Sequence, residues 1–167
     1  MNLYLDRKRI AFILLSFLSL LFSLICTFAK GWSTYRGASY GLFSPDIKND
    51  NVCGALTDDN SSCLHWFRAA QACMLLGLLS HILTFVGLVL AETRNFRFWL
   101  AGTGEFAVGT FTILALIVYS FQSPYQKGVP LFDLGWAFKL AWTIGFFSLV
   151  AAVIGISDGT KAEGVKL

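Results

Sequence analysis

Four long runs of hydrophobic residues, separated by polar segments, dominate the pattern along the chain. They cover residues 10–29, 69–91, 98–121 and 136–156. A helix that crosses a bilayer needs about 20 predominantly apolar residues, and each run is long enough. Backbone polar groups in lipid have to be paired within their own segment, which favours helices over isolated strands. The pattern therefore predicts an all-α membrane protein, a bundle of four transmembrane helices in contact with the lipid bilayer.

The composition supports this prediction. Of the 167 residues, 56% are hydrophobic and 14% are charged, whereas soluble domains average about 25% charged residues. The mean hydropathy is +0.64. The net charge is only +3 and the chain has no dense basic run with interleaved aromatic residues. We therefore expect no nucleic acid among its partners.

The first hydrophobic run has an alternative interpretation as a cleaved signal peptide. Arg7-Lys8-Arg9 would be its basic start, and Thr27-Phe28-Ala29 its cleavage site. The apolar core of a signal peptide is usually about 7 to 15 residues long, and this run is longer. The length favours a true transmembrane helix.

The basic residues predict which side of the membrane each connection occupies. Four spans place three segments on one side: residues 1–9, the turn 92–97 and the tail 157–167. This side carries the tight Arg7-Lys8-Arg9 cluster, and short basic segments mark the cytoplasmic side of a membrane. We therefore expect both termini in the cytoplasm. The loops 30–68 and 122–135 would then lie outside the cell or in a secretory lumen.

The first outer loop contains a polar stretch with two cysteines, Cys53 and Cys63. Disulfides persist in the oxidising compartment that we expect for this loop, and one that closes a loop of this length is worth about 2 to 3 kcal/mol. A metal site is disfavoured because only His65 is nearby and a structural zinc site needs four ligands. We predict no metal and no cofactor. Asn60-Ser61-Ser62 is a glycosylation sequon on the correct side, at Asn60.

The same loop carries a resemblance to a known family. Trp32, the run Gly41-Leu42-Phe43 and the two cysteines resemble the W…GLW…C…C signature of the claudin, epithelial membrane protein and peripheral myelin protein superfamily. Phe43 stands where the family usually has tryptophan. Arg68, within Trp66–Ala72, looks like part of the family's start of the second span.

The resemblance implies a particular fold and localisation. We expect a four-helix bundle with a small disulfide-tied extracellular β-sheet, to which the second outer loop can add a strand. The Cys53–Cys63 disulfide would join two neighbouring strands. The protein would be integral to the plasma membrane or to a cell junction.

Two polar residues lie deep in the predicted spans. Glu105 is about 10 Å from Phe98 along its helix, and His81 is about 15 Å from Ala91, at 1.5 Å per residue. These depths are close enough for a hydrogen bond between neighbouring antiparallel helices. The pair can be a proton- or ligand-sensitive site or a satisfied structural contact, and the sequence favours the second interpretation.

Small and polar residues recur at helical spacing on every span, which predicts close packing between the helices. The stripes are Ser16, Ser19, Ser23 and Cys26 on the first span, Ala70, Cys73, Gly77, Ser80, Thr84 and Gly87 on the second, Gly102, Glu105, Gly109 and Thr112 on the third, and Ala137, Ala141, Gly145, Ser148, Ala152 and Gly155 on the fourth.

The motifs of known enzyme and transporter classes do not occur. The sequence has no CxxC pair, no HExxH and no second intramembrane carboxylate, so we expect no enzyme. No internal repeat or pair of broken helices indicates a transporter.

Two function classes remain, and the superfamily includes both. The first is an organiser of cell-cell or lateral membrane contacts through the extracellular loops, with the same protein or related four-span proteins as partners. The second is an auxiliary subunit of an ion channel or receptor complex. The apolar ending Val165-Lys166-Leu167 also fits a PDZ protein as a partner.

Overall fold

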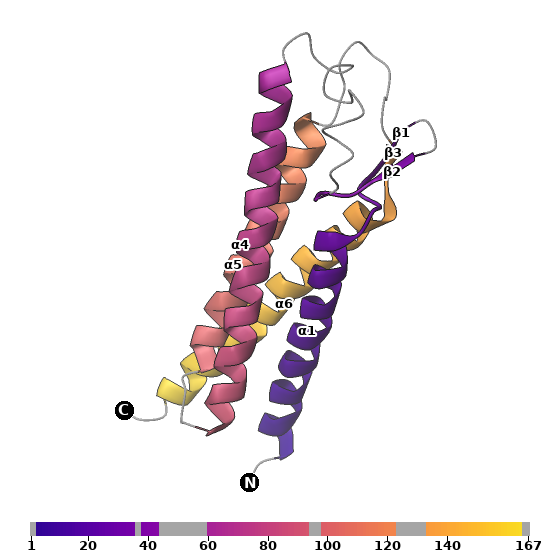
Figure 1. Cartoon of the computed structure of the whole chain (residues 1–167). Helices are drawn as coiled ribbons and strands as arrows, with labels where there is room; N and C mark the ends of the chain where they lie inside the picture. Colours follow the sequence, from indigo (N-terminus) through magenta and orange to yellow (C-terminus); the bar gives the residue numbers. More distant parts are fainter. Residues whose placement is uncertain (1–2, 36–37, 44–59, 94–97, 123–132, 165–167) are drawn as a thin grey trace.

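The structure of the chain is a computed structural model that describes residues 3–35, 38–43, 60–93, 98–122 and 133–164 (Figure 1). Four helices make up most of these residues: α1 (Leu3–Phe28), α4 (Asn60–Thr93), α5 (Phe98–Gln122) and α6 (Trp136–Gly164). Three short strands accompany them: β1 (Ser33–Tyr35), β2 (Ala38–Tyr40) and β3 (Asp133–Leu134).

Each helix contains a segment that is long and apolar enough to cross a membrane. These segments are Arg9–Phe28, Phe67–Val89, Trp99–Phe121 and Trp136–Ser157. The prediction of an all-α bundle of four such helices is confirmed, and the chain is an integral membrane protein. Hydropathy placed the segments well but underestimated the lengths of the helices, because a helix can continue past the apolar residues that lie in the lipid.

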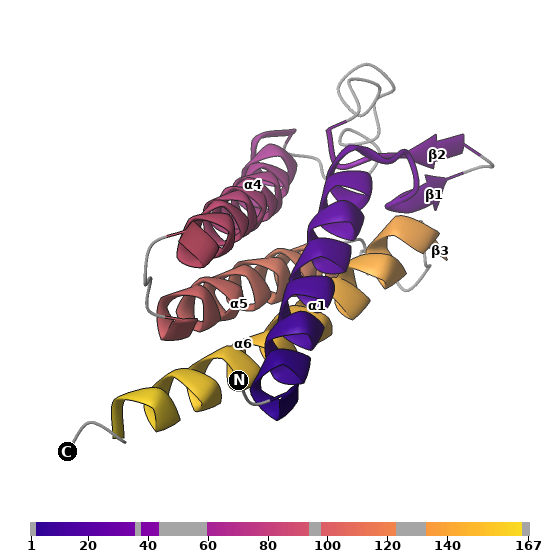
Figure 2. The same ribbon diagram turned by 90° about the horizontal axis from the view of Figure 1, so that it is seen from below.

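The helices are arranged so that α5 packs along both α4 and α6, while α1 packs against α6 and less extensively against α4 (Figure 2). The start of α1 and the end of α6 lie at the same end of the bundle (Figure 1). The three strands lie at the opposite end, which we call the sheet end.

The strands form one antiparallel sheet in the order β2-β1-β3. Ser33 in β1 pairs with Tyr40 in β2 on one side and with Leu134 in β3 on the other. β1 follows α1 and β3 directly precedes α6, so the sheet joins the ends of two neighbouring helices. The structure thus contains a small sheet with one strand, β3, from the segment 122–135.

The position of Cys63 differs from the expectation that its disulfide joins two strands of the sheet. Cys63 lies in the first turn of α4, which begins at Asn60, so a disulfide at Cys63 would not join two neighbouring strands. Asn and Ser are preferred at helix starts because their side chains accept hydrogen bonds from the first free backbone N–H groups. The stretch Asn60-Ser61-Ser62 has this character, and hydropathy alone does not detect it.

The bundle has two buried apolar clusters. The larger one is at the sheet end and comprises Cys26, Trp32, Leu42, Phe67, Ala70, Met74, Ala115, Leu116, Tyr119, Ala137, Phe138, Ala141 and Ile144. The smaller one, at the end that carries the termini, comprises Phe12, Leu88, Ala101 and Ala151. Leucine, isoleucine, valine and phenylalanine side chains on the outer faces are exposed, as expected for contact with lipid.

Small residues bring α5 and α6 very close together at the level of the smaller cluster. A Cβ atom added to Gly155 would lie 2.8 Å from Cα of Gly102 and 2.9 Å from Cε2 of Phe12. Real Cβ atoms essentially never approach other atoms so closely. Phe12 on α1, Gly102 on α5 and Gly155 on α6 therefore share one level in the bundle.

Candidate functional site

Trp32 anchors the sheet to the helices. It follows α1 and is fully buried, and its indole Nε1 donates a hydrogen bond to the carbonyl oxygen of Cys26 at 2.6 Å. Its ring meets Tyr119 and Phe138 edge-on, at centroid distances of 5.2 and 6.1 Å. Such edge-to-face pairs are favourable beyond the area they bury. The indole thereby connects α1, α5 and α6 below the sheet.

Backbone hydrogen bonds hold the same region from both sides. The Trp32 N–H donates to the carbonyl of Tyr40 at 2.9 Å, and the Gly135 N–H donates to the carbonyl of Trp32 at 2.8 Å. The Ala137 N–H donates to Gly31 at 2.9 Å. A Cβ atom on Gly135 would collide with the Gly31 carbonyl oxygen, so the close approach of these two segments requires glycine.

The Gly41-Leu42-Phe43 run returns the chain from β2 to the bundle. A Cβ atom on Gly41 would lie 2.5 Å from the carbonyl oxygen of Ala29. Leu42 is fully buried, and its carbonyl oxygen accepts a hydrogen bond from Gln71 Nε2 on α4 at 2.7 Å. Phe43 stacks against Phe28 at 6.1 Å. The structure therefore gathers Trp32 and this run at the junction of the sheet and three helices.

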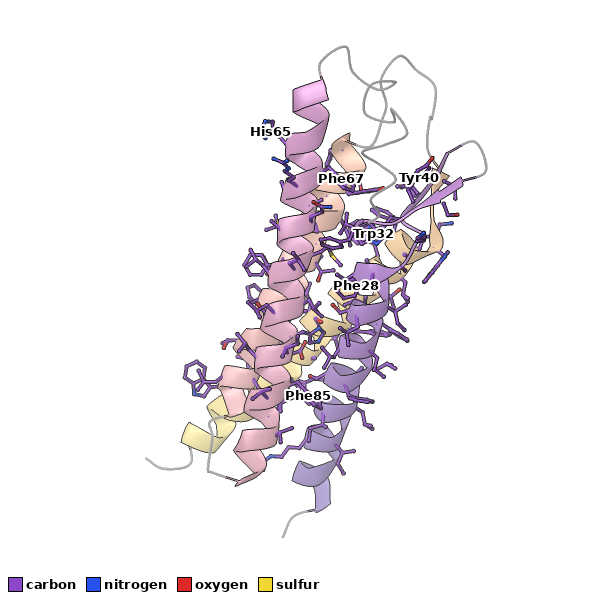
Figure 3. All side chains as sticks on the ribbon, in the orientation of Figure 1. Phe28, Trp32, Tyr40, His65, Phe67 and Phe85 are labelled. Atoms are coloured by element: carbon purple, nitrogen blue, oxygen red, sulfur yellow. The ribbon has the colours of Figure 1, made fainter. Side chains whose placement is uncertain are left out.

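The other residues predicted for the outer face lie apart from this junction. Arg68 is exposed on α4, and His65 points away from the bundle, whereas Phe67 points toward Trp32 (Figure 3). Cys53 lies outside the described residues. Asn60 and Cys63 are in the first turn of α4, but their side chains are outside the described part of the chain.

A second group of polar residues lies in the middle of the bundle. His81 Nε2 is 3.5 Å from Glu105 Oε2, and both side chains are fully buried. The structure thus brings the two residues together across α4 and α5. The distance is too long for a good hydrogen bond, and none of their four ring and carboxyl heteroatoms has a hydrogen-bond partner among the described residues. The two residues are thus in contact, as expected, but without a hydrogen bond between them in this geometry.

Three serines share this property. Ser16 and Ser19 on α1 and Ser148 on α6 are buried, and their Oγ atoms have no hydrogen-bond partner in the described part of the chain. We call the five residues Ser16, Ser19, His81, Glu105 and Ser148 the polar layer. All four helices contribute to it. No three His, Cys, Asp or Glu side chains among the described residues gather into a metal-binding group.

A groove on the outside of the bundle runs between α4 and α5. Its volume is about 310 Å³, and small residues line much of it: Ser80, Thr84, Gly87, Ala101, Thr103, Gly104 and Ala107, with Leu83 and Leu100. Ser80 and Gly87 of the α4 stripe are therefore partly exposed in this groove, whereas Thr84 is buried. The stripes of α1, α5 and α6 are buried.

Neither a protein-family model nor a curated protein matches the chain.

Sequence reasoning missed several residues of these sites. Tyr119 donates its hydroxyl to Ser33 Oγ at 3.0 Å beneath the sheet, and Gln71 binds Leu42 as described above. A polar residue among apolar neighbours was the available signal for both. The serines of the polar layer were interpreted only as small packing residues.

Proposed function

We propose that this protein is a claudin-like four-span membrane protein that organises cell-cell or lateral membrane contacts through the loops at its sheet end. The observation that carries the proposal is the anchoring of the sheet by Trp32. A buried indole, a backbone ladder and the Gly41-Leu42-Phe43 return fix the sheet on three helices. Residues 36–37 and 44–59 directly follow described residues of this base, so a partner that binds them would meet segments next to an ordered part of the chain, at a lower entropy cost.

In this proposal the sheet end is extracellular and both termini are cytoplasmic, at the plasma membrane or a cell junction. Cys53 and Cys63 form a disulfide that ties the loop to the start of α4. Asn60 carries a glycan. The Arg7-Lys8-Arg9 cluster supports this orientation. The protein is not an enzyme, and its partners are further copies, related four-span proteins and, at Val165–Leu167, a PDZ protein.

A mixed-cell assay tests this function. Two cell populations express the full chain with different cytoplasmic tags, and co-purification after mixing reports contact across cells, while co-expression reports contact within one membrane. We expect the two tagged chains to co-purify in at least one of these two experiments, mixing or co-expression. Exchanging Asp58 and Asp59 for lysine should reduce it without changing surface expression, whereas the same exchange at Asp6, on the terminal side, should not. Absence of capture in both formats would contradict the proposal.

The groove between α4 and α5 favours a second candidate, the auxiliary subunit of an ion channel or receptor. Transmembrane helices associate through small residues that permit close approach, and this groove presents them on the outer surface. Thr103→Trp would fill the groove, and Val153→Trp places the same ring on an exposed position of α6. Loss of a co-purifying channel or receptor with the first variant, but not the second, would support this candidate.

A further inference from the structure

The five residues of the polar layer lie close together along the bundle axis. Phe12, Gly102 and Gly155 mark one level, as described above. Glu105 is three residues beyond Gly102 toward the sheet end, about 4.5 Å at 1.5 Å per residue, and Ser16 is four residues beyond Phe12, about 6 Å. Ser19 and Ser148 are each seven residues from the marked level, about 10.5 Å.

These residues also share the faces that meet at the marked level. Positions three, four and seven residues apart lie on one face of a helix. Ser16 and Ser19 therefore share a face with Phe12, Glu105 with Gly102, and Ser148 with Gly155. Since Gly155 lies against both Gly102 and Phe12, the polar groups converge on the bundle interior, and His81 joins them through its 3.5 Å contact with Glu105.

The three serine hydroxyls of the polar layer do not form the hydrogen bond to their own helix that is available to a serine. A serine or threonine in a helix can donate to the carbonyl four residues earlier. Thr27, Thr84, Thr110 and Ser120 do so in this bundle, at 2.6 to 2.8 Å. Ser16, Ser19 and Ser148 do not. Their oxygen atoms are left for a partner in the layer.

Unpaired polar atoms at this depth are costly. A buried donor or acceptor without a partner loses its hydration and gains nothing in return, and an ionisable side chain in a membrane span normally faces a partner or water. The layer contains seven buried heteroatoms without a hydrogen-bond partner among the described residues, on Ser16, Ser19, His81, Glu105 and Ser148, and two of them, His81 Nε2 and Glu105 Oε2, lie within ion-pair distance of each other. Apolar clusters lie on both sides of it, and among the described residues Trp99 Nε1 is the one other buried side-chain heteroatom without a hydrogen-bond partner.

We propose that the polar layer is an internal binding site for water, in which bound water molecules bridge His81 and Glu105 to the serines of α1 and α6. Buried water typically makes about three hydrogen bonds to groups that are otherwise unpaired. Water can donate to the Glu105 oxygens and accept from the serine hydroxyls, whereas the side chains are too short or too distant to do so directly. The site links α1, which has the fewest direct contacts in the bundle, to the other helices. It does not depend on the proposed contact function.

Radiolytic hydroxyl-radical footprinting of the full chain in lipid nanodiscs tests this site, because bound water generates the radical beside the residues it touches. We expect oxidation of His81 at a rate close to that of exposed His65. Met74, two turns along α4 and equally buried in the apolar cluster, is the matched control and should be protected despite its more reactive sulfur. Protection of His81 to the same degree as Met74 would overturn the proposal.

Two further arms identify the occupant. In Glu105→Leu, oxidation of His81 should be lost. If that variant does not fold, the comparison of His81 with Met74 in the native chain still decides the question. In the second arm, the thermal midpoint of the native chain and of Glu105→Gln is measured in sodium chloride and in choline chloride. We expect no difference between the salts. A midpoint that rises with sodium only when Glu105 is present would assign the site to a cation and overturn the assignment to water.

Discussion

Trp32 donates its indole N–H to the carbonyl oxygen of Cys26 across 2.6 Å, although they are six positions apart in the chain and α1 ends between them. The bond caps a carbonyl in the last turn of α1, where the helix has no N–H of its own to offer. One side chain therefore terminates the first helix and fixes the first residue before the sheet. The anchoring of the sheet end depends on this contact more than on the three short strands.

Trp32→Phe should destabilise the protein by about 1 to 3 kcal/mol, because the buried Cys26 carbonyl loses its donor while most of the ring packing is kept. Trp142→Phe is the control, since Trp142 is exposed on α6, and its effect should stay within about 0.5 kcal/mol. Unfolding in mixed micelles measures both. Equal effects of the two substitutions would contradict the role of the hydrogen bond.

Tyr119 and Ser33 should be energetically coupled, because the Tyr119 hydroxyl donates to Ser33 Oγ at 3.0 Å in a buried position. Tyr119→Phe and Ser33→Ala each remove the bond. The double variant removes both groups, so it should be less destabilised than the sum of the single variants by about 0.5 to 1.5 kcal/mol. A double-mutant cycle of unfolding free energies gives this coupling. Strict additivity would mean that the contact contributes nothing.

Gly155→Ala should force α6 away from α5 and α1, since the new Cβ would lie 2.8 Å from the Gly102 Cα. Overpacking of this kind costs about 1 to 3 kcal/mol. Gly77→Ala is the matched control, because its Cβ would meet the Thr112 side chain at 3.3 Å, and that neighbour can shift slightly. Thermal midpoints in detergent distinguish the two. If Gly77→Ala is the more damaging change, the tight α5–α6 contact is not what holds these helices.

His81 and Glu105 should behave as a unit. Either single change, His81→Leu or Glu105→Leu, leaves the other side chain buried and without its ionisable neighbour, at a cost of about 1 to 3 kcal/mol. The double change to leucine should recover stability, because replacing a buried polar pair by apolar residues is often neutral. The measurement is again the unfolding free energy of the three variants. A double variant as unstable as the sum of the singles would show that the two residues act separately.

Cys53 and Cys63 should be linked, whereas Cys26 and Cys73 are free thiols in the structure. Peptide mass spectrometry after alkylation without reduction should recover a crosslinked Cys53–Cys63 peptide pair. Cys53→Ser should lower the unfolding free energy by about 2 to 3 kcal/mol. Cys73→Ser is the control and should leave the linked pair intact. Recovery of alkylated Cys53 and Cys63 from the native chain would contradict the disulfide.

The parts of the fold that hydropathy controls could be predicted from the sequence. The four spans follow from the length of the apolar runs, and buried stripes follow from small residues at helical spacing. The helical state of Cys63 could not be predicted this way, because a helix start outside the lipid depends on local capping. Pairing between β1 and β3 joins residues about 100 positions apart, and two or three residues of sequence carry no signal for it; only the resemblance to the superfamily implied a strand from the second loop.

The members of the polar layer could likewise be predicted from the sequence only in part. The depth of Glu105 and His81 along neighbouring helices placed them together, since the rise of a helix is fixed. The participation of Ser16, Ser19 and Ser148 could not be predicted, because a serine in a span is normally satisfied by its own helix. Only the structure distinguishes a hydroxyl that bonds back to its helix from one that does not.

If the sheet end organises contacts between membrane proteins, the mass and composition of the complex extracted from its native membrane in a gentle detergent should show the partner directly. We expect a self-oligomer or an assembly with related four-span proteins. A large ion channel or receptor at fixed stoichiometry would contradict it and would establish the groove between α4 and α5 as the interface to map first.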